Sequence, residues 1–191
     1  MPRKAGDGSP NGMPYEPWRS FLQELDEHLK SPIELHCLGG FVVTQQYGVG
    51  RETSDIDFVT VVPRSTFDNI EKVAGLGSAL YRKYRLYMQH VGIATVPESY
   101  ESRLTHMFVS APWQRLNLFA LEANDLALSK LERNTERDRQ DVLLLARAGH
   151  LNPHILKERY DTELRQYFLS KTEWHDQTLQ LWIEMCWPSE G

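Results

Sequence analysis

Two short apolar runs, each bounded by glycine or acidic residues, constrain the fold of this chain more than any other feature. The first run is 33–38, and it ends at the pair Gly39–Gly40. The second is 55–62, which opens with the letters DIDF. Apolar runs of this length between polar and glycine-rich segments are typical of buried strands. We therefore expect two strands joined by the glycine pair and a short helix at 41–47.

The second predicted strand begins with two aspartates, Asp55 and Asp57. Residues two apart on a strand project from the same face, so the two carboxylates are expected side by side. Adjacent carboxylates repel each other unless a cation lies between them. Mg²⁺, which binds to a few carboxylates and to substrate phosphates, fits such a pair. The alternative is a surface strand end at which the aspartates only cap a turn.

The residues before the acidic pair are candidates for binding a phosphate group. A helix N-terminus that carries little side-chain bulk, such as Gly39–Gly40, can receive a phosphate on its free N–H groups. The alternative is an ordinary tight turn, which also favours glycine. Arg51 either contacts phosphate or pairs with a carboxylate, and Thr53 either contributes to nucleotide binding or shapes the turn.

The pattern of GG, YG, RxTS and DID across 39–57 resembles the signature of the nucleotidyltransferase superfamily, which includes DNA polymerase beta and the minimal nucleotidyltransferases. It is most similar to an uncharacterised bacterial family that resembles the toxin components of toxin–antitoxin and abortive-infection systems. The resemblance covers 33–167. It implies Mg²⁺-dependent transfer of a nucleoside monophosphate from an NTP to a tRNA or protein acceptor, with an antitoxin protein as partner.

A second stretch, 126–141, extends the resemblance. Its letters LALSKLERNTERDRQD are similar to a K-L and R-D-x-x-D segment of the toxin-like enzymes. By that resemblance Lys130 neutralises the triphosphate, while Asp138 and Asp141, one helical turn apart, lie near the site. The alternative is a solvated, charged helix with internal ion pairs of little energetic weight.

Active members of the superfamily typically carry a third carboxylate on a neighbouring strand. The predicted strand 85–96 contains no acidic residue and has Gln89 and His90 at its middle. Glu122, which ends the predicted strand 115–121, could supply the acid, although it could equally be an acidic residue at a helix N-terminus. The alternative function is therefore a catalytically inactive binding or interaction module of this fold.

The remaining helix signals follow ordinary start and stop rules. We expect helices at 16–30, 66–74 and 78–83, a polar loop at 97–106, and C-terminal helices that begin near 124, 135, 152 and 170. Thr135 with Asp138 predicts a capping box, and Asn152–Pro153 an N-cap followed by proline.

Together these elements predict an α/β (α+β) fold, with a small mixed β-sheet of about four strands flanked by helices and a helical C-terminal half. We expect a disordered tail at 1–14, a nucleotidyltransferase-like core at 15–122, and a helical region at 123–191 packed on the core. A net charge of −5 argues against broad nonspecific binding to nucleic acid. Two cysteines, no secretory signal and no membrane-length apolar run predict a cytoplasmic protein.

Overall fold

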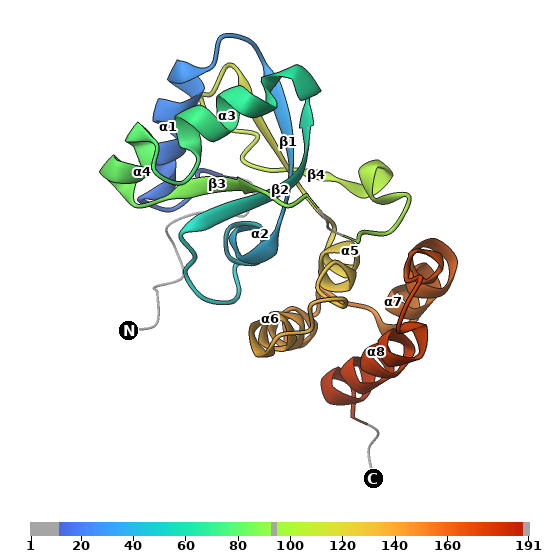
Figure 1. Ribbon diagram of the computed structural model, residues 1–191. Coiled ribbons are helices and arrows are strands. Elements are labelled where there is room, and N and C mark those ends of the chain that lie inside the picture. The colour runs from blue at the N-terminus through green and yellow to red at the C-terminus, as the bar shows by residue number, and fades with distance from the viewer. Residues whose placement is uncertain (1–11, 93–94, 189–191) are drawn as a thin grey trace. The chain divides into compact units, whose positions relative to one another are not determined.

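The computed structural model describes residues 12–92 and 95–188, and these residues form two compact units (Figure 1). The first unit contains the described residues up to Gly92 together with Thr105–Ala120. The second contains residues 95–104 and the described residues from Leu121 onward. Most of the predicted tail at 1–14 lies outside the described residues. No described helix combines the length and the apolar character needed to cross a membrane.

The first unit is built on a mixed sheet that has five strands among the described residues. The strands are β1 (Ile33–Leu38), β2 (Asp55–Val62), β3 (Tyr87–His90), β4 (Thr105–His106) and β5 (Leu116–Ala120). Their spatial order is β3-β2-β1-β5-β4 (Figure 1). β1 runs antiparallel to β2 and parallel to β5, and β2 runs parallel to β3. The predicted mixed α/β fold is confirmed, with one strand more than expected.

The additional strand is β4, which lies in the segment predicted as a polar loop. It has only two residues, so it is too short to show the alternation by which strands are recognised. The predicted strand 85–96 is too long, because β3 ends at His90. The Val91 amide still donates to the carbonyl of Phe58, and Gly92 follows. The end of that predicted strand includes residues 93 and 94, which lie outside the described residues.

Helices cover the sheet of the first unit. They are α1 (Trp18–His28), α2 (Gly39–Gln45), the 3₁₀ turn η1 (Arg64–Thr66), α3 (Phe67–Ala74) and α4 (Ala79–Tyr84). The apolar face of α1 is buried, and α1, α3 and α4 contact one another (Figure 1). The buried carboxylate of Asp26 on α1 accepts hydrogen bonds from the amides of Gln114, Arg115 and Leu116 at 2.7–3.1 Å. This contact fixes α1 to the start of β5.

All the secondary-structure elements described in the second unit are helices or helical turns. Its elements are η2 (Tyr100–Arg103), α5 (Ala123–Leu128), α6 (Glu136–Arg147), α7 (Pro153–Arg159), the π turn η3 (Tyr160–Leu164), the 3₁₀ turn η4 (Arg165–Tyr167) and α8 (Thr172–Cys186). Buried leucines and Trp182 form its core. The predicted capping box of Thr135 and Asp138 is confirmed, and so is the Asn152 cap before Pro153.

The last helix begins differently from the prediction. Ser170 does not cap it. The N-cap of α8 is Lys171, which has a left-handed backbone conformation with a φ of 59°, and no side chain caps the helix. A β-carbon makes this conformation uncommon outside glycine, asparagine and aspartate. The start of α8 is therefore a strained and uncapped helix terminus.

Candidate active site

The paired aspartates lie at the start of β2, between β3 and β1 in the sheet. Along this strand Ile56 and Phe58 are fully buried, whereas Asp55 and Asp57 are half-buried. The alternation places the apolar side chains in the core and both carboxylates on the opposite face. Burial, together with the nearby charges of Asp55 and Asp57, raises the pKa of the Tyr87 phenol on β3. Both carboxylates therefore contribute negative charge to the same small region beside the sheet.

The glycine pair lies against this acidic pair because of the register between β1 and β2. Leu38, the last residue of β1, is paired with Asp57, and α2 begins at the next residue, Gly39. Gly39 has a φ of 75°, and any β-carbon there would collide with Oδ2 of Asp57. Only glycine satisfies both conditions without strain. The backbone at the start of α2 thus directly adjoins the Asp57 carboxylate.

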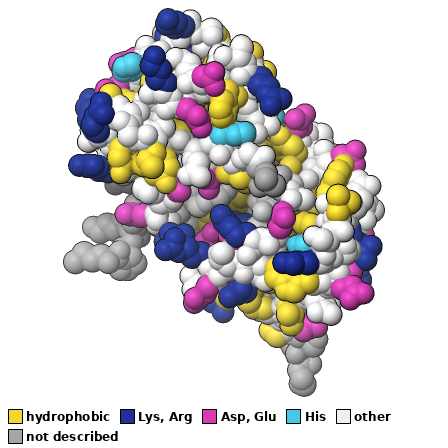
Figure 2. Space-filling view, viewed as in Figure 1, with side chains coloured by type: hydrophobic (Ala, Val, Ile, Leu, Met, Phe, Trp, Pro, Cys, Tyr) yellow, Lys and Arg dark blue, Asp and Glu magenta, His cyan; other side chains and the backbone are white. Residues whose placement is uncertain are grey.

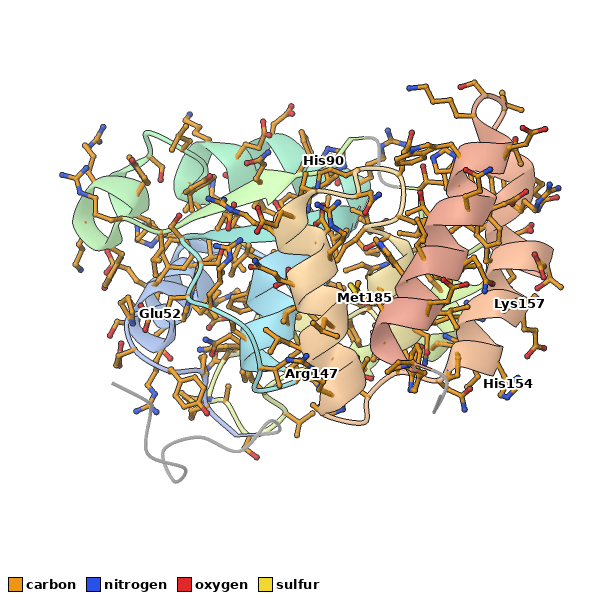
Figure 3. The ribbon with its side chains drawn as sticks, turned by 90° about the horizontal axis from the view of Figure 1, so that it is seen from below. Glu52, His90, Arg147, His154, Lys157 and Met185 are labelled. Carbon is orange, nitrogen blue, oxygen red and sulfur yellow. The ribbon has the colours of Figure 1, made fainter. Side chains whose placement is uncertain are left out.

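The loop before β2 contributes one further contact. The hydroxyl of Thr53 donates to Oδ1 of Asp55. Thr53 also adjoins Gly40, since a β-carbon on Gly40 would lie 3.4 Å from Cβ of Thr53. Arg51 and its neighbour Glu52 (Figure 3) are exposed in the same loop. Thr53 therefore orients one aspartate, while the predicted phosphate contact of Arg51 stays a prediction.

The neighbouring strand β3 carries no carboxylate beside the pair. The parallel register of β2 and β3 places Tyr87 opposite Asp55 and Gln89 opposite Asp57. Among the described residues, no group of three or more His, Cys, Asp or Glu side chains is arranged to hold a metal ion. At this strand position the chain therefore offers the amide of Gln89 rather than a third acid.

The other predicted acids and the predicted lysine lie in the second unit. Lys130 follows α5, and its side chain is only 3% exposed. Its Nζ lies 2.9 Å from Oδ2 of Asp141 and 3.6 Å from Oδ1 of Asp138. Both acids are buried on one side of α6. The structure thus brings these three side chains together, and the role of Lys130 toward a triphosphate stays a prediction.

Asp138 is the most strongly held of these acids. Its carboxylate accepts hydrogen bonds from Arg133 at 2.6 and 2.9 Å, and from the backbone and hydroxyl of Thr135. Although burial alone would raise the pKa of Asp138, these bonds and the charge of Lys130 lower it to about 2. The segment is therefore a buried ion-pair network and not a charged helix surrounded by solvent.

Glu122 belongs to a different network in the second unit. It is the N-cap of α5, where it accepts hydrogen bonds from the amide and side chain of Asn124, and it pairs with Arg159. Arg159 also pairs with the fully buried Asp125 at 2.9 Å, and Arg103 pairs with Asp125 at 2.7 Å. These contacts give Glu122 a role at the helix N-terminus.

Comparison with known protein families matches residues 19–186 to the nucleotidyltransferases of unknown function (DUF6036). The match spans most of the 191 residues. The chain belongs to this nucleotidyltransferase family. Comparisons with curated proteins and with solved structures gave no match. The predicted membership of the nucleotidyltransferase superfamily is thereby confirmed.

Sequence reasoning missed one residue of this candidate site. Tyr87 lies beside both aspartates, but its position depends on the parallel register between β2 and β3. Residues 63–86, which separate the two strands, contain no signal for that register. The sequence contains two nearby tyrosines, Tyr84 and Tyr87, and gives no indication of which one faces the acids.

We predict that Gly39→Ala lowers the free energy of unfolding by roughly 2 to 4 kcal/mol, since it adds a strained φ to a collision with Asp57. Urea denaturation of the whole chain measures this change. Gly48→Ala is a matched control, because Gly48 also has a positive φ, of 69°, but has open space around it. If Gly39→Ala lowers the free energy of unfolding no more than Gly48→Ala does, the inferred close approach of Gly39 to Asp57 is wrong.

We predict that Asp138→Asn destabilises the chain at pH 7 and that its cost shrinks in acid. The pKa of Asp138 is lowered from 3.8 to about 2 on folding. Its ionisation therefore contributes about 2 kcal/mol above pH 4, and this contribution is lost as the pH falls toward 2. Urea unfolding at pH 7, 4 and 2.5 measures the difference. Glu136→Gln, at an exposed position on the same helix, is the control. If Asp138→Asn lowers the free energy of unfolding by the same amount at every pH, the ionised Asp138 does not stabilise the network.

Proposed function

We propose that the chain is a magnesium-dependent nucleotidyltransferase that transfers a nucleoside monophosphate from an NTP to a tRNA or protein acceptor. The observation that carries the proposal is the position of Asp55 and Asp57 on one strand, with the glycine start of α2 against Asp57. The family membership supports the reaction class. The choice between tRNA and protein rests on the resemblance to toxin-like enzymes.

The donor set fits Mg²⁺ that arrives with a nucleotide. Two half-buried carboxylates provide hard oxygen ligands, and Mg²⁺ commonly binds to one or two carboxylates plus substrate phosphates and water. Asp55 and Asp57 would hold the ion. When bound, Mg²⁺ would polarise the α-phosphate and neutralise charge on the pyrophosphate leaving group.

The chain's own residues would position the nucleotide around this pair. The first-turn amides of α2 at Gly39 and Gly40 have no acceptor within the helix, and no described side chain caps it. They can donate to phosphate oxygens, which approach closely because neither residue has a side chain. The Thr53 hydroxyl holds Oδ1 of Asp55 and so fixes the orientation of one carboxylate. These groups would orient the α-phosphate for in-line attack by an acceptor hydroxyl.

A second candidate function is a catalytically inactive binding module of the same fold. Gln89 favours it, because an amide stands opposite Asp57 where active members of the superfamily typically carry an acid. Such a module would retain nucleotide contacts at the start of α2 but would not transfer the nucleotidyl group. Activity and metal affinity therefore distinguish the two candidates.

We expect the wild-type chain, given MgCl₂ and α-labelled NTPs, to label a tRNA or protein acceptor. Asp55→Asn and Asp57→Asn should each reduce labelling at least about 100-fold, because each removes charge from the metal-binding pair. EDTA should abolish labelling. The exposed Asp68→Asn in the same unit is the control and should label normally. Equal labelling by wild type and Asp57→Asn would exclude this site, and no labelling by the wild type would favour the inactive module.

We predict that Gln89→Glu tightens Mg²⁺ binding in the absence of nucleotide by about tenfold, because a third carboxylate beside Asp57 adds attraction for a cation. Isothermal titration calorimetry with MgCl₂ measures the dissociation constant. The double variant Gln89→Glu/Asp57→Asn should lose the gain. Unchanged Mg²⁺ affinity in Gln89→Glu would show that this face of the sheet does not hold the ion.

A further inference from the structure

A run of aromatic and basic residues joins α4 to β3 beside the acidic pair. Its letters at 81–87 are YRKYRLY, which place three tyrosines among three cationic side chains. Proteins that bind single-stranded nucleic acid use this combination, because bases stack on aromatic rings while phosphates pair with Lys or Arg. Part of the run faces α1 instead, since the side chains of Lys83 and Tyr84 both contact the carboxylate of Glu24. The side chains that remain for a ligand are those of Tyr81, Arg82, Arg85 and Tyr87.

Tyr87 connects this run to the acidic pair. It is paired with Asp55 in the register of β2 and β3, and its amide donates to the carbonyl of Ser54 at 3.0 Å. Paired residues of neighbouring strands project from the same face, so the Tyr87 ring stands on the face that carries both aspartates. The ring meets that of Tyr81 edge to face, with 5.9 Å between the centroids. Both tyrosines are half-buried, so an aromatic surface that is partly open to solvent leads from the acidic pair to α4.

Two arginines supply positive charge at the α4 end of this aromatic surface. Arg85 is exposed, and its guanidinium carbon lies 5.8 Å from the centroid of the Tyr81 ring. Arg82 is also exposed and donates to the neutral carbonyl of Gly77 at 3.0 Å, so it keeps its full charge. Figure 2 shows this grouping, with Lys and Arg side chains over α4 next to hydrophobic side chains at β3. A phosphate can therefore pair with an arginine while the adjoining base stacks on a tyrosine.

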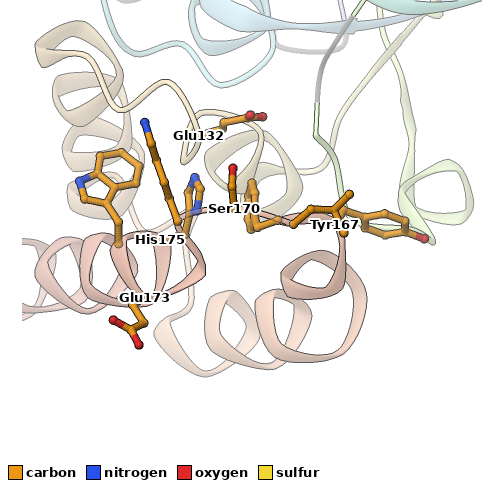
Figure 4. A pocket seen from close by; sticks show the side chains of 9 residues that line it. Glu132, Tyr167, Ser170, Glu173 and His175 are labelled. Atoms are coloured by element: carbon orange, nitrogen blue, oxygen red, sulfur yellow. The ribbon is translucent and has the colours of Figure 1, made fainter.

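A large cavity in the second unit also has aromatic side chains but differs in its charges. Its volume is about 890 Å³, and its lining includes Trp174 (Figure 4). The cation in that lining, Lys171, is accompanied by Glu132 and Glu173, which offset its charge. The rings at positions 81 and 87 have arginines next to them instead. The surface on α4 and β3 therefore suits a ligand with phosphate groups better than this cavity does.

The geometry of nucleotidyl transfer decides which substrate this surface faces, and this step rests on the proposed function. The acceptor hydroxyl and the leaving pyrophosphate lie on opposite sides of the α-phosphorus. The phosphate-binding turn at Gly39–Gly40 follows β1 and adjoins Asp57 from the β1 side of β2. β3 lies on the other side of β2. The acceptor would therefore approach from β3, where Tyr87 stands beside Asp55.

We propose an acceptor surface for the hydroxyl end of a single-stranded nucleic acid, formed by Tyr81, Arg82, Arg85 and Tyr87. The last bases stack on the two tyrosines, and their phosphates pair with the two arginines. The terminal hydroxyl oxygen bonds to the α-phosphorus as the bond to pyrophosphate breaks, and the hydroxyl proton passes to water. RNA and DNA both present this chemistry, so the experiment separates them.

Binding is measured without transfer, by fluorescence anisotropy of a labelled single-stranded oligoribonucleotide of about eight nucleotides with the whole chain, MgCl₂ and no NTP. Tyr87→Leu should weaken binding at least about tenfold because it removes a stacking ring, whereas Tyr87→Phe keeps the ring and should bind like the wild type. Arg85→Asn should weaken binding and also reduce its dependence on salt concentration, since it removes a phosphate contact. Asparagine tolerates the left-handed backbone at position 85, where φ is 60°.

Matched controls make the binding result decisive. Lys72→Gln removes an exposed cation from α3, and Trp174→Leu removes an exposed aromatic ring from the second unit, so neither should change binding. A duplex of the same sequence should bind more weakly, because its bases stack on one another. An oligodeoxyribonucleotide of that sequence separates the sources: the tighter ligand is the acceptor, and equal affinity admits both. The acceptor surface is overturned if the wild type does not bind the single strand, if Tyr87→Leu and Arg85→Asn bind normally, or if the duplex binds as tightly.

Labelling of the same oligonucleotide with an α-labelled NTP tests the transfer separately. Tyr87→Leu should raise the KM for the oligonucleotide at least about tenfold with little change in kcat, because the acidic pair is intact. Asp55→Asn/Asp57→Asn should bind the oligonucleotide like the wild type but should not label it. Binding that depends on Tyr87 without any labelling would overturn the proposed transfer and support the nucleic-acid surface. Labelling with an unchanged KM in Tyr87→Leu would overturn the acceptor surface.

Discussion

The first unit depends on the close approach of the Gly39 backbone to the Asp57 carboxylate. The antiparallel register of β1 and β2 creates it, because Leu38 is paired with Asp57 and α2 begins at the following residue. The register itself is fixed by the apolar side chains that both strands bury in one core. A slip by one residue would turn Ile56 and Phe58 outward and both aspartates inward. The same burial that stabilises the sheet therefore holds the acidic pair beside the glycine turn.

Most of the candidate site was predictable because it is local in sequence. Gly39, Gly40, Asp55 and Asp57 flank two strands whose bounds matched the prediction, since glycine and aspartate mark the ends of both apolar runs. Features that depend on pairing between distant segments were not predictable. The positions of Tyr87 and Gln89 require the parallel register of β2 and β3, and β4 is too short to carry a periodic signal. The predicted third strand was too long because apolar residues continue past the point where pairing ends.

Charge patterns in the second unit illustrate a different limit of prediction from sequence. The segment from Lys130 to Asp141 reads equally as a solvated helix or as a functional cluster, because sequence gives the spacing of charges but not their burial. In the structure Lys130, Asp138 and Asp141 are all buried and paired. Removing one partner from such a network leaves an uncompensated buried charge, which costs far more than loss of an exposed pair. The buried ion pairs of Lys130 therefore contribute to the stability of the second unit, whatever further role Lys130 has toward phosphate.

The described part of β3 places no third acid beside Asp55 and Asp57, and this has a consequence for how substrate and metal would bind. A pair of aspartates supplies only part of the ligand set that Mg²⁺ requires, so the nucleotide's phosphates would have to supply more. Bound Mg²⁺ would then raise the affinity of the site for the nucleotide, and bound nucleotide would raise its affinity for Mg²⁺ by the same factor, because the coupling free energy is reciprocal. Gln89, opposite Asp57, adds no negative charge beside the two aspartates, whereas an acid there would. A site of this kind would discriminate against free cations and assemble only around a bound nucleotide.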